Sequence, residues 1–269
     1  MASQNSGASS RSWSRSMFGV DGSAALTLNA GMILQKRLPY DVSTPRRLPG
    51  VAPFDMADWL QVDEAYAGQM AERVRLLSER RTDVLRLDPD AKAAAGELLD
   101  LVLAHLPEGF SREGERIFCP DGRVVEADRS DPLGTLGVIV QEDLCLMQPR
   151  DGVHVLTGAV LCFPASWLLS EKFLRPLVGI HDPVKVYDEG LAKRVQRLFD
   201  GLQPGRPLWR YNLLNYDDPA LFQPRSENAR RPEVDQETAP FTRSERQCLV
   251  RLPQTGAVVF SIHTYIVAR

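Results

Sequence analysis

Histidine side chains are the first candidates for chemistry in this sequence, because imidazole binds metal ions and exchanges a proton near neutral pH. The sequence contains four histidines, His105, His154, His181 and His263. His181 has distinctive neighbours: apolar residues precede it and Asp182-Pro183 follows it. Asp182 or a backbone carbonyl could fix the ring tautomer, and the proline restricts the backbone before it. From the residues alone, each of the four is also compatible with a core or surface position.

The other three histidines have simpler interpretations. His105 ends an expected helix, where a protonated imidazole suits the helix dipole. His154 comes directly after a turn and is expected to face solvent. His263 lies in the middle of the last expected strand and faces either the core or a pocket.

Cysteine spacing argues against a zinc site. Cys119, Cys145, Cys162 and Cys248 form no C-x-x-C pair. Three of them lie in apolar, strand-like segments, so we expect buried free thiols in a reducing compartment. A cysteine thiolate can also bind iron, which leaves Cys162 as an alternative ligand.

The composition excludes several classes of protein. The 269 residues include 32 basic and 35 acidic side chains, a net charge of −3 that does not suit a general nucleic-acid binder. There is no apolar run of about 18 residues, so no membrane span is expected. The N-terminus lacks the compact apolar segment of a signal peptide. We therefore expect a cytoplasmic protein.

The stretch before His181 predicts a rigid support for a site. Two apolar segments, Asp143–Gln148 and Val153–Phe163, flank the turn Pro149–Gly152 and predict a hairpin. The second segment is apolar almost throughout, which is typical of a strand buried on both faces. A strand pair that leads to a fixed imidazole is how a site could be built.

Helical and hairpin signals occur along the rest of the chain. Helices are predicted from about Trp59 to Leu77, after a cap at Asp55 or Asp58, and at 89–105, 132–140 and 189–202. Further strands are predicted at 116–119, 123–126, 206–214, 246–252 and 257–267. The polar, proline-rich segment from 216 to 241 is expected to be an irregular loop. Antiparallel hairpins with helices between them predict an α+β fold.

Five blocks of sequence resemble the heme-dependent oxidative N-demethylase family. They are VQEDLCLM, VLCFPASW, IHDPVKVYDE, PLWRYN and RSERQCLVRLPQTGAVVFSIHTY, and they occur in the family's order between Leu38 and Val267. The resemblance implies a PAS-like antiparallel sheet with covering helices, and heme b bound between the two. It also implies a single heme-binding domain, which we expect at 36–269. Residues 1–35, which are rich in Ser, Gly and Ala, are expected to form an extended N-terminal segment, flexible or wrapping.

The resemblance also implies roles for particular residues. It makes His181 the expected proximal iron ligand, with His263 and Cys162 as rivals. Heme propionates need cationic or hydrogen-bonding partners, so the cofactor-binding candidates are Arg210, Asn212 and Arg246 along with His181. Polar residues in the same blocks give the catalytic candidates Glu142, His263 and Tyr265, of which Glu142 or Tyr265 could bind an amine.

The function that the resemblance implies is oxidation of a small amine with dioxygen, by oxidative N-demethylation. The sequence has no C-x-x-C-H motif, so the heme is expected to be non-covalent. It also has no G-x-G-x-x-G fingerprint, so electrons are expected from a partner. The resemblance implies that this partner is a flavin and iron–sulfur reductase. Lys185-Val186 and Leu213 depart from the family's pattern. This keeps open a heme oxygenase with a different substrate, and a non-catalytic PAS-like heme sensor is the other alternative.

Overall fold

The computed structural model describes residues 32–43, 50–181, 189–230 and 233–269. Within these residues a seven-stranded sheet has the order β1-β8-β9-β10-β6-β7-β2, and every neighbouring pair is antiparallel. The strands of this sheet are β1 (Ala52–Pro53), β2 (Leu85–Leu87), β6 (Asp143–Arg150), β7 (Val153–Val160), β8 (Leu208–Tyr216), β9 (Phe241–Arg251) and β10 (Val258–Ala268). The predicted α+β class is confirmed, whereas the PAS-like topology stays a prediction.

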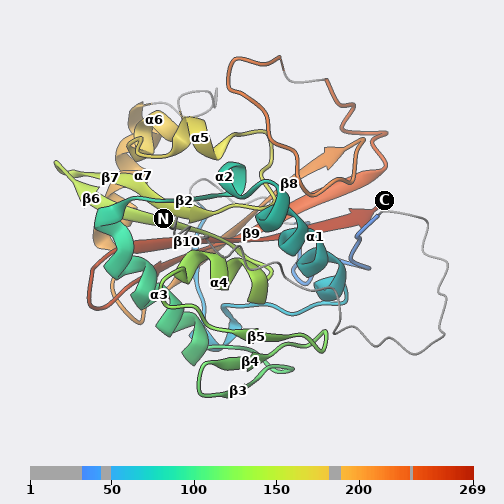
Figure 1. The fold of residues 1–269 in the computed structure, drawn as a ribbon. Coiled ribbons are helices and arrows are strands. Elements are labelled where there is room, and N and C mark those ends of the chain that lie inside the picture. The colour runs from blue at the N-terminus through green and yellow to red at the C-terminus, as the bar shows by residue number, and fades with distance from the viewer. Residues whose placement is uncertain (1–31, 44–49, 182–188, 231–232) are drawn as a thin grey trace, which may run out of the picture. The chain divides into compact units, whose positions relative to one another are not determined.

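Helices and a small second sheet complete the described part of the chain (Figure 1). The small sheet consists of β3 (Ser111–Glu113), β4 (Arg116–Phe118) and β5 (Val124–Glu126). The helices are α1 (Tyr66–Glu79), α2 (Arg81–Val84), α3 (Lys92–Ala104), α4 (Pro132–Ile139), α5 (Leu169–Lys172), α6 (Leu177–His181) and α7 (Glu189–Gly201).

The hairpin predicted before His181 is present as β6 and β7. Arg150 pairs with Val153, so the connecting loop is Asp151-Gly152, and both of its residues have positive φ. A two-residue loop of this kind matches the twist of the flanking strands, and Asp-Gly is one of the sequences that favour it. The turn chemistry therefore sets the register of the strand pair.

The helix predicted from Trp59 begins later than expected. Asp55 caps a short 3₁₀ turn at Met56–Asp58, and α1 starts only at Tyr66. Trp59 leaves the helical path because its ring is completely buried against the sheet, where Nε1 donates to Ser261 Oγ at 2.9 Å. Burial of a large ring with its N–H satisfied outweighed the helical spacing of the neighbouring residues.

Alternation along the strands divides the side chains between two faces of the sheet. His263 of β10 pairs with Arg246 of β9, so these two side chains share a face. The next row, Thr264, Glu245 and Asn212, points to the other face. We call the first the α1 face and the second the α6 face, after the helices that cover them. Figure 1 shows α5, α6 and α7 gathered beside β6 and β7, away from α3 and α4.

Each face has an apolar cluster of its own. The cluster on the α1 face includes Trp59, Met70, Leu98, Leu136 and Val259. The cluster on the α6 face includes Met147, Leu156, Leu177, Phe199 and Val258. Sheet and helices therefore enclose an apolar layer on both sides, as an α+β fold requires.

The predicted boundary between residues 35 and 36 lies within the described part of the chain. Gln35 forms a bridge to Val267 of β10, and its side-chain amide accepts from the backbone N–H of Ile266 at 2.8 Å. The segment from Met32 is thus already joined to the sheet, and residues 1–31 lie outside the described residues.

Candidate functional site

Asn212 and Glu245 form the centre of a polar group on the α6 face. Asn212 Nδ2 donates to Glu245 Oε2 at 2.8 Å, and Asn212 Oδ1 accepts from the Glu245 backbone N–H at 3.0 Å. Gln247 Nε2 donates to the same carboxylate oxygen at 3.0 Å. These bonds fix the carboxylate in one orientation on neighbouring strands.

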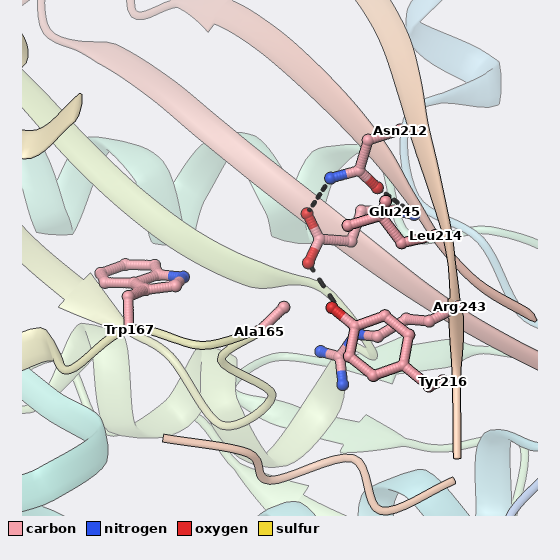
Figure 2. Close-up of a pocket in the computed structure, with 7 residues that line it drawn as sticks. All are labelled: Ala165, Trp167, Asn212, Leu214, Tyr216, Arg243 and Glu245. Carbon is pink, nitrogen blue, oxygen red and sulfur yellow. Dashed lines mark hydrogen bonds and ion pairs between the residues drawn. The ribbon is translucent and has the colours of Figure 1, made fainter. Parts of the chain in front are cut away.

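A pocket of about 200 Å³ opens beside this pair (Figure 2). Trp167 and Tyr216 give it aromatic walls, while Asn212, Arg243 and Glu245 supply its polar groups. Figure 2 shows the Tyr216 hydroxyl pointing toward the Glu245 carboxylate. The pocket therefore combines aromatic surface with fixed charges, in a volume that suits only a small ligand or part of a larger one.

Arg243 is held firmly at the base of the pocket. Its Nη2 donates to the carbonyl of Phe163 at 2.6 Å, and its Nη1 donates to the carbonyl of Leu221 at 3.1 Å. Its Nε lies 3.9 Å from Glu245 Oε1, close enough for an ion pair but too far for a hydrogen bond. Arg243 therefore ties two loops to the sheet, and its Nε–H has no hydrogen-bond partner in the part of the chain that the structure describes.

Arg210, a predicted cofactor-binding residue, lies on the same face two residues before Asn212 on β8. Its Nε atom is buried and has no hydrogen-bond partner among the described residues. Burial lowers the pKa of its guanidinium, although the nearby Glu245 carboxylate acts in the opposite direction. A partly desolvated cation whose Nε has no hydrogen-bond acceptor among the described residues favours the approach of an anion.

His181, the predicted iron ligand, is the last residue of α6. A short helix forms here after Pro176, and the Ile180 N–H donates to the Pro176 carbonyl at 3.0 Å. Leu177 of α6 is buried in the apolar cluster of the α6 face. The side chain of His181, and the following Asp182 and Pro183, lie outside the described residues.

Glu142 and His263, two predicted catalytic residues, meet on the α1 face. His263 Nδ1 lies 2.9 Å from Glu142 Oε1, and its Nε2 lies 3.1 Å from Asp63 Oδ2. Burial alone would lower the pKa of His263, but hydrogen bonds and attraction from the two carboxylates raise it to about 9. Burial likewise opposes ionisation of Asp63, yet the bond from His263 lowers its pKa to about 2. An imidazolium between two carboxylates is therefore the stable state near neutral pH.

Tyr265 and Arg246 belong to the same buried region. The Tyr265 ring centroid lies 4.5 Å from that of His263, and burial raises the pKa of its hydroxyl. Arg246 donates through Nη1 to the carbonyl of Trp59 at 2.9 Å and through Nη2 to that of Asp58 at 2.7 Å. Its guanidinium is thus used to hold the segment before α1.

The predicted site residues consequently fall into two groups. Glu142, His263, Tyr265 and Arg246 lie on the α1 face, whereas Arg210 and Asn212 lie on the α6 face together with the pocket and α6. The sheet stands between the groups. The role of each residue in binding or catalysis stays a prediction.

Several residues of these two regions were not singled out from the sequence. Trp167 lies in an irregular segment, and Asp63 precedes α1 without forming its cap. Asp63 and His263 are 200 positions apart, so no local pattern connects them. Glu245 lies in the continuous polar run Thr242–Gln247 at the start of the last resembling block, and no local pattern distinguishes it from its neighbours there.

The described residues were also compared with the requirements of a metal-binding site and of a membrane-spanning helix. Among the described residues, no group of three or more histidine, cysteine, aspartate or glutamate side chains is placed to hold a metal ion. A search of the same residues finds no helix of the length and apolar character needed to cross a bilayer.

The sequence was found to be similar to a known family over most of its length. Residues 50–268 match the family model described as Haem-dependent oxidative N-demethylase, alpha subunit-like. The matched range includes β1, the whole of the main sheet, both faces described above and α6.

Proposed function

The chain belongs to the heme-dependent oxidative N-demethylase, alpha subunit-like family, and from this membership we propose that it is a heme-dependent monooxygenase subunit that demethylates a small amine. The observation that carries the proposal is the match over residues 50–268, which covers the pocket and both sets of candidate residues.

The residues of the α6 face fit a non-covalent heme b. Heme requires an axial donor, an apolar enclosure and partners for its propionates. The apolar cluster under α6 and α7 is the proposed enclosure, and His181 is the proposed axial ligand. The proposed propionate contact is Arg210, whose buried Nε has no hydrogen-bond partner in the described part of the chain. Asn212, beside it, is the proposed contact to the heme edge.

Bound heme would supply the oxygen activation and electron transfer that side chains do not provide. The protein's own residues have other tasks. His181 would bind the iron, the α6-face cluster would exclude water, and Arg210 would hold a propionate. In the overall reaction, dioxygen, a pair of electrons and protons convert the N-methyl group to formaldehyde and release water.

The proposal includes a partner that supplies electrons. The family description names an alpha subunit, which supports a multi-component enzyme. We propose a flavin and iron–sulfur reductase in this role, and a cytoplasmic location. All four cysteines are buried free thiols, as a reducing compartment would keep them.

The α1-face residues support the fold in this proposal. The His263 ring is fully buried and both its nitrogens are bonded to carboxylates, so no atom of it is available to a ligand. The earlier prediction that Glu142, His263 and Tyr265 act on the substrate is untested, and their burial supports a structural role instead.

The test is an absorption spectrum of the purified protein, followed by turnover. We expect a Soret band with about one heme per chain, and formaldehyde release from a secondary amine once a reductase system is added. A protein that stays colourless after reconstitution with hemin would contradict the proposal. A heme-loaded protein that releases no formaldehyde from any methylated amine would favour an oxygenase with another substrate or a sensor.

A further inference from the structure

The pocket beside Glu245 has more hydrogen-bond donors than acceptors. Glu245 Oε2 already accepts from Asn212 and Gln247, at 2.8 and 3.0 Å. Its other oxygen faces the Tyr216 hydroxyl and the Arg243 guanidinium (Figure 2). The carboxylate that an incoming cation would need is therefore surrounded by donors of the protein itself.

Arg243 provides an unused donor at the pocket wall. The residue is 2% exposed, and its two terminal nitrogens donate to backbone carbonyls of Phe163 and Leu221. Its Nε–H is buried and has no hydrogen-bond partner within the described residues. A buried charged donor left without an acceptor is costly, so a ligand oxygen at this position would be stabilising.

Two further polar atoms on the same face are also unsatisfied. Thr264 pairs with Glu245 across the strands, and its buried Oγ1 has no hydrogen-bond partner in the described ranges. Arg210 Nε, on β8, is likewise buried and has no hydrogen-bond partner among the described residues. Of these three groups Arg243 lines the pocket itself, whereas Thr264 and Arg210 lie on neighbouring strands of the same face. Together with the single Glu245 carboxylate, the two arginines leave an excess of positive charge on this face.

We propose that this pocket is a carboxylate-binding subsite. Arg243 from its lining and Arg210 from the neighbouring part of β8 bind the carboxylate, and Trp167 and Tyr216 enclose the carbon atoms next to it. Guanidinium groups bind carboxylates with charge-assisted hydrogen bonds, and aromatic rings suit the adjoining apolar atoms. The volume of about 200 Å³ is smaller than a porphyrin, so the occupant is either a heme propionate or a separate small acid, such as a substrate that bears a carboxylate.

The proposed carboxylate subsite does not itself depend on heme. Only the assignment of a heme propionate as its occupant rests on the proposed function. The experiment therefore begins with heme-free protein and two probes of similar size and opposite charge, acetate and methylammonium. Calorimetric titration should show acetate binding and no methylammonium binding. Arg210→Gln should weaken acetate binding at least tenfold, and Arg206→Gln, which removes an exposed arginine on the turn before β8, should leave it unchanged.

The heme-loaded protein then distinguishes the two sources. If a propionate fills the subsite, heme should exclude acetate, and heme dimethyl ester should bind at least tenfold more weakly than heme. If a separate acid fills it, acetate should bind the heme-loaded protein and shift the Soret band. Arg210→Gln should remove this shift. Loss of the shift in this variant would exclude binding of acetate at the iron itself. Both outcomes support the subsite.

Two results would overturn the inference. One is the absence of acetate binding in both heme-free and heme-loaded protein. The other is binding of methylammonium that Glu245→Gln abolishes, which would make the pocket a cation site. Thr264→Val provides a variant without a charge change, and it should weaken acetate binding without unfolding the protein. A failure to take up heme would contradict the proposed function but leave the acetate titration of heme-free protein valid.

Discussion

His263 is paired with Glu142 inside the protein, with Nδ1 and Oε1 2.9 Å apart and both side chains almost wholly buried. Asp63 completes the arrangement from the other side of the ring, at 3.1 Å. The three residues come from β10, from the start of the central hairpin and from the segment before α1. Their charges therefore join parts of the chain that are distant in sequence.

Replacing His263 with Gln should destabilise the fold strongly. The substitution leaves two carboxylates without their shared cation, and removal of one partner from a buried ion pair typically costs about 3–5 kcal/mol. Denaturant unfolding followed by circular dichroism measures the change. As a control, His105→Gln at the half-buried end of α3 should cost about 1 kcal/mol or less, because it alters one bond to the Leu101 carbonyl. Equal losses in the two variants would contradict a special role for the buried group.

The stability of the protein should fall as the pH is raised above neutral. The pKa of His263 is raised from 6.5 to about 9 in the folded protein. Its stabilising contribution is therefore complete below pH 6.5 and is lost as the pH rises through about 9. Asp63 behaves in the opposite sense: its pKa is lowered from 3.8 to about 2, so its contribution is complete above pH 3.8 and is lost toward pH 2.

Urea unfolding at pH 6.5 and pH 9 tests the predicted loss of stability at alkaline pH. The free energy of unfolding of the unmodified protein should fall by more than that of His263→Gln over this range. The comparison is needed because buried cysteine and tyrosine side chains, whose pKa values burial raises, also destabilise the fold at high pH. Parallel pH profiles for the two proteins would show that His263 is not the group responsible.

Close packing between α4 and the sheet should make Gly137 intolerant of a side chain. A Cβ atom there would lie 2.7 Å from Leu77 Cδ1 and 2.8 Å from Val160 Cγ2, both closer than real contacts allow. Gly137→Ala should therefore cost roughly 1–3 kcal/mol through overpacking. Gly96→Ala in α3 is a matched control, because a Cβ atom there meets nothing within 4 Å. It should stabilise the helix by up to about 1 kcal/mol. Thermal unfolding of both variants distinguishes the effects, and a neutral Gly137→Ala would contradict this packing.

Local signals predicted much of the fold. Asp151-Gly152 between apolar runs predicted the β6–β7 hairpin, and alternating residues predicted β10. Such patterns depend on neighbours in sequence, where turn chemistry and side-chain alternation operate. The start of α1 was missed because Trp59 is held by a contact with Ser261, more than two hundred positions away.

The candidate site was harder to predict for the same reason. Arg210 and Asn212 were selected from one block and Arg246 from another, but alternation on paired strands places Arg246 on the other face of the sheet. Pairing between distant strands decides that separation, and a single sequence does not reveal which strands pair. Asp63 beside His263 is a second example, since neither residue predicts the other.

The remaining prediction concerns the proposed axial ligand, His181 at the end of α6. In His181→Ala the iron should lose its imidazole donor, so the Soret band should shift and heme affinity should fall by at least tenfold, since even outer-shell residues of metal sites cost about 10–100-fold. His105→Ala, at the end of α3, should retain the spectrum and heme content of the unmodified protein. Circular dichroism checks that each variant is folded. If His181→Ala kept its heme and spectrum while a folded His263→Ala lost heme, the ligand would instead be on β10.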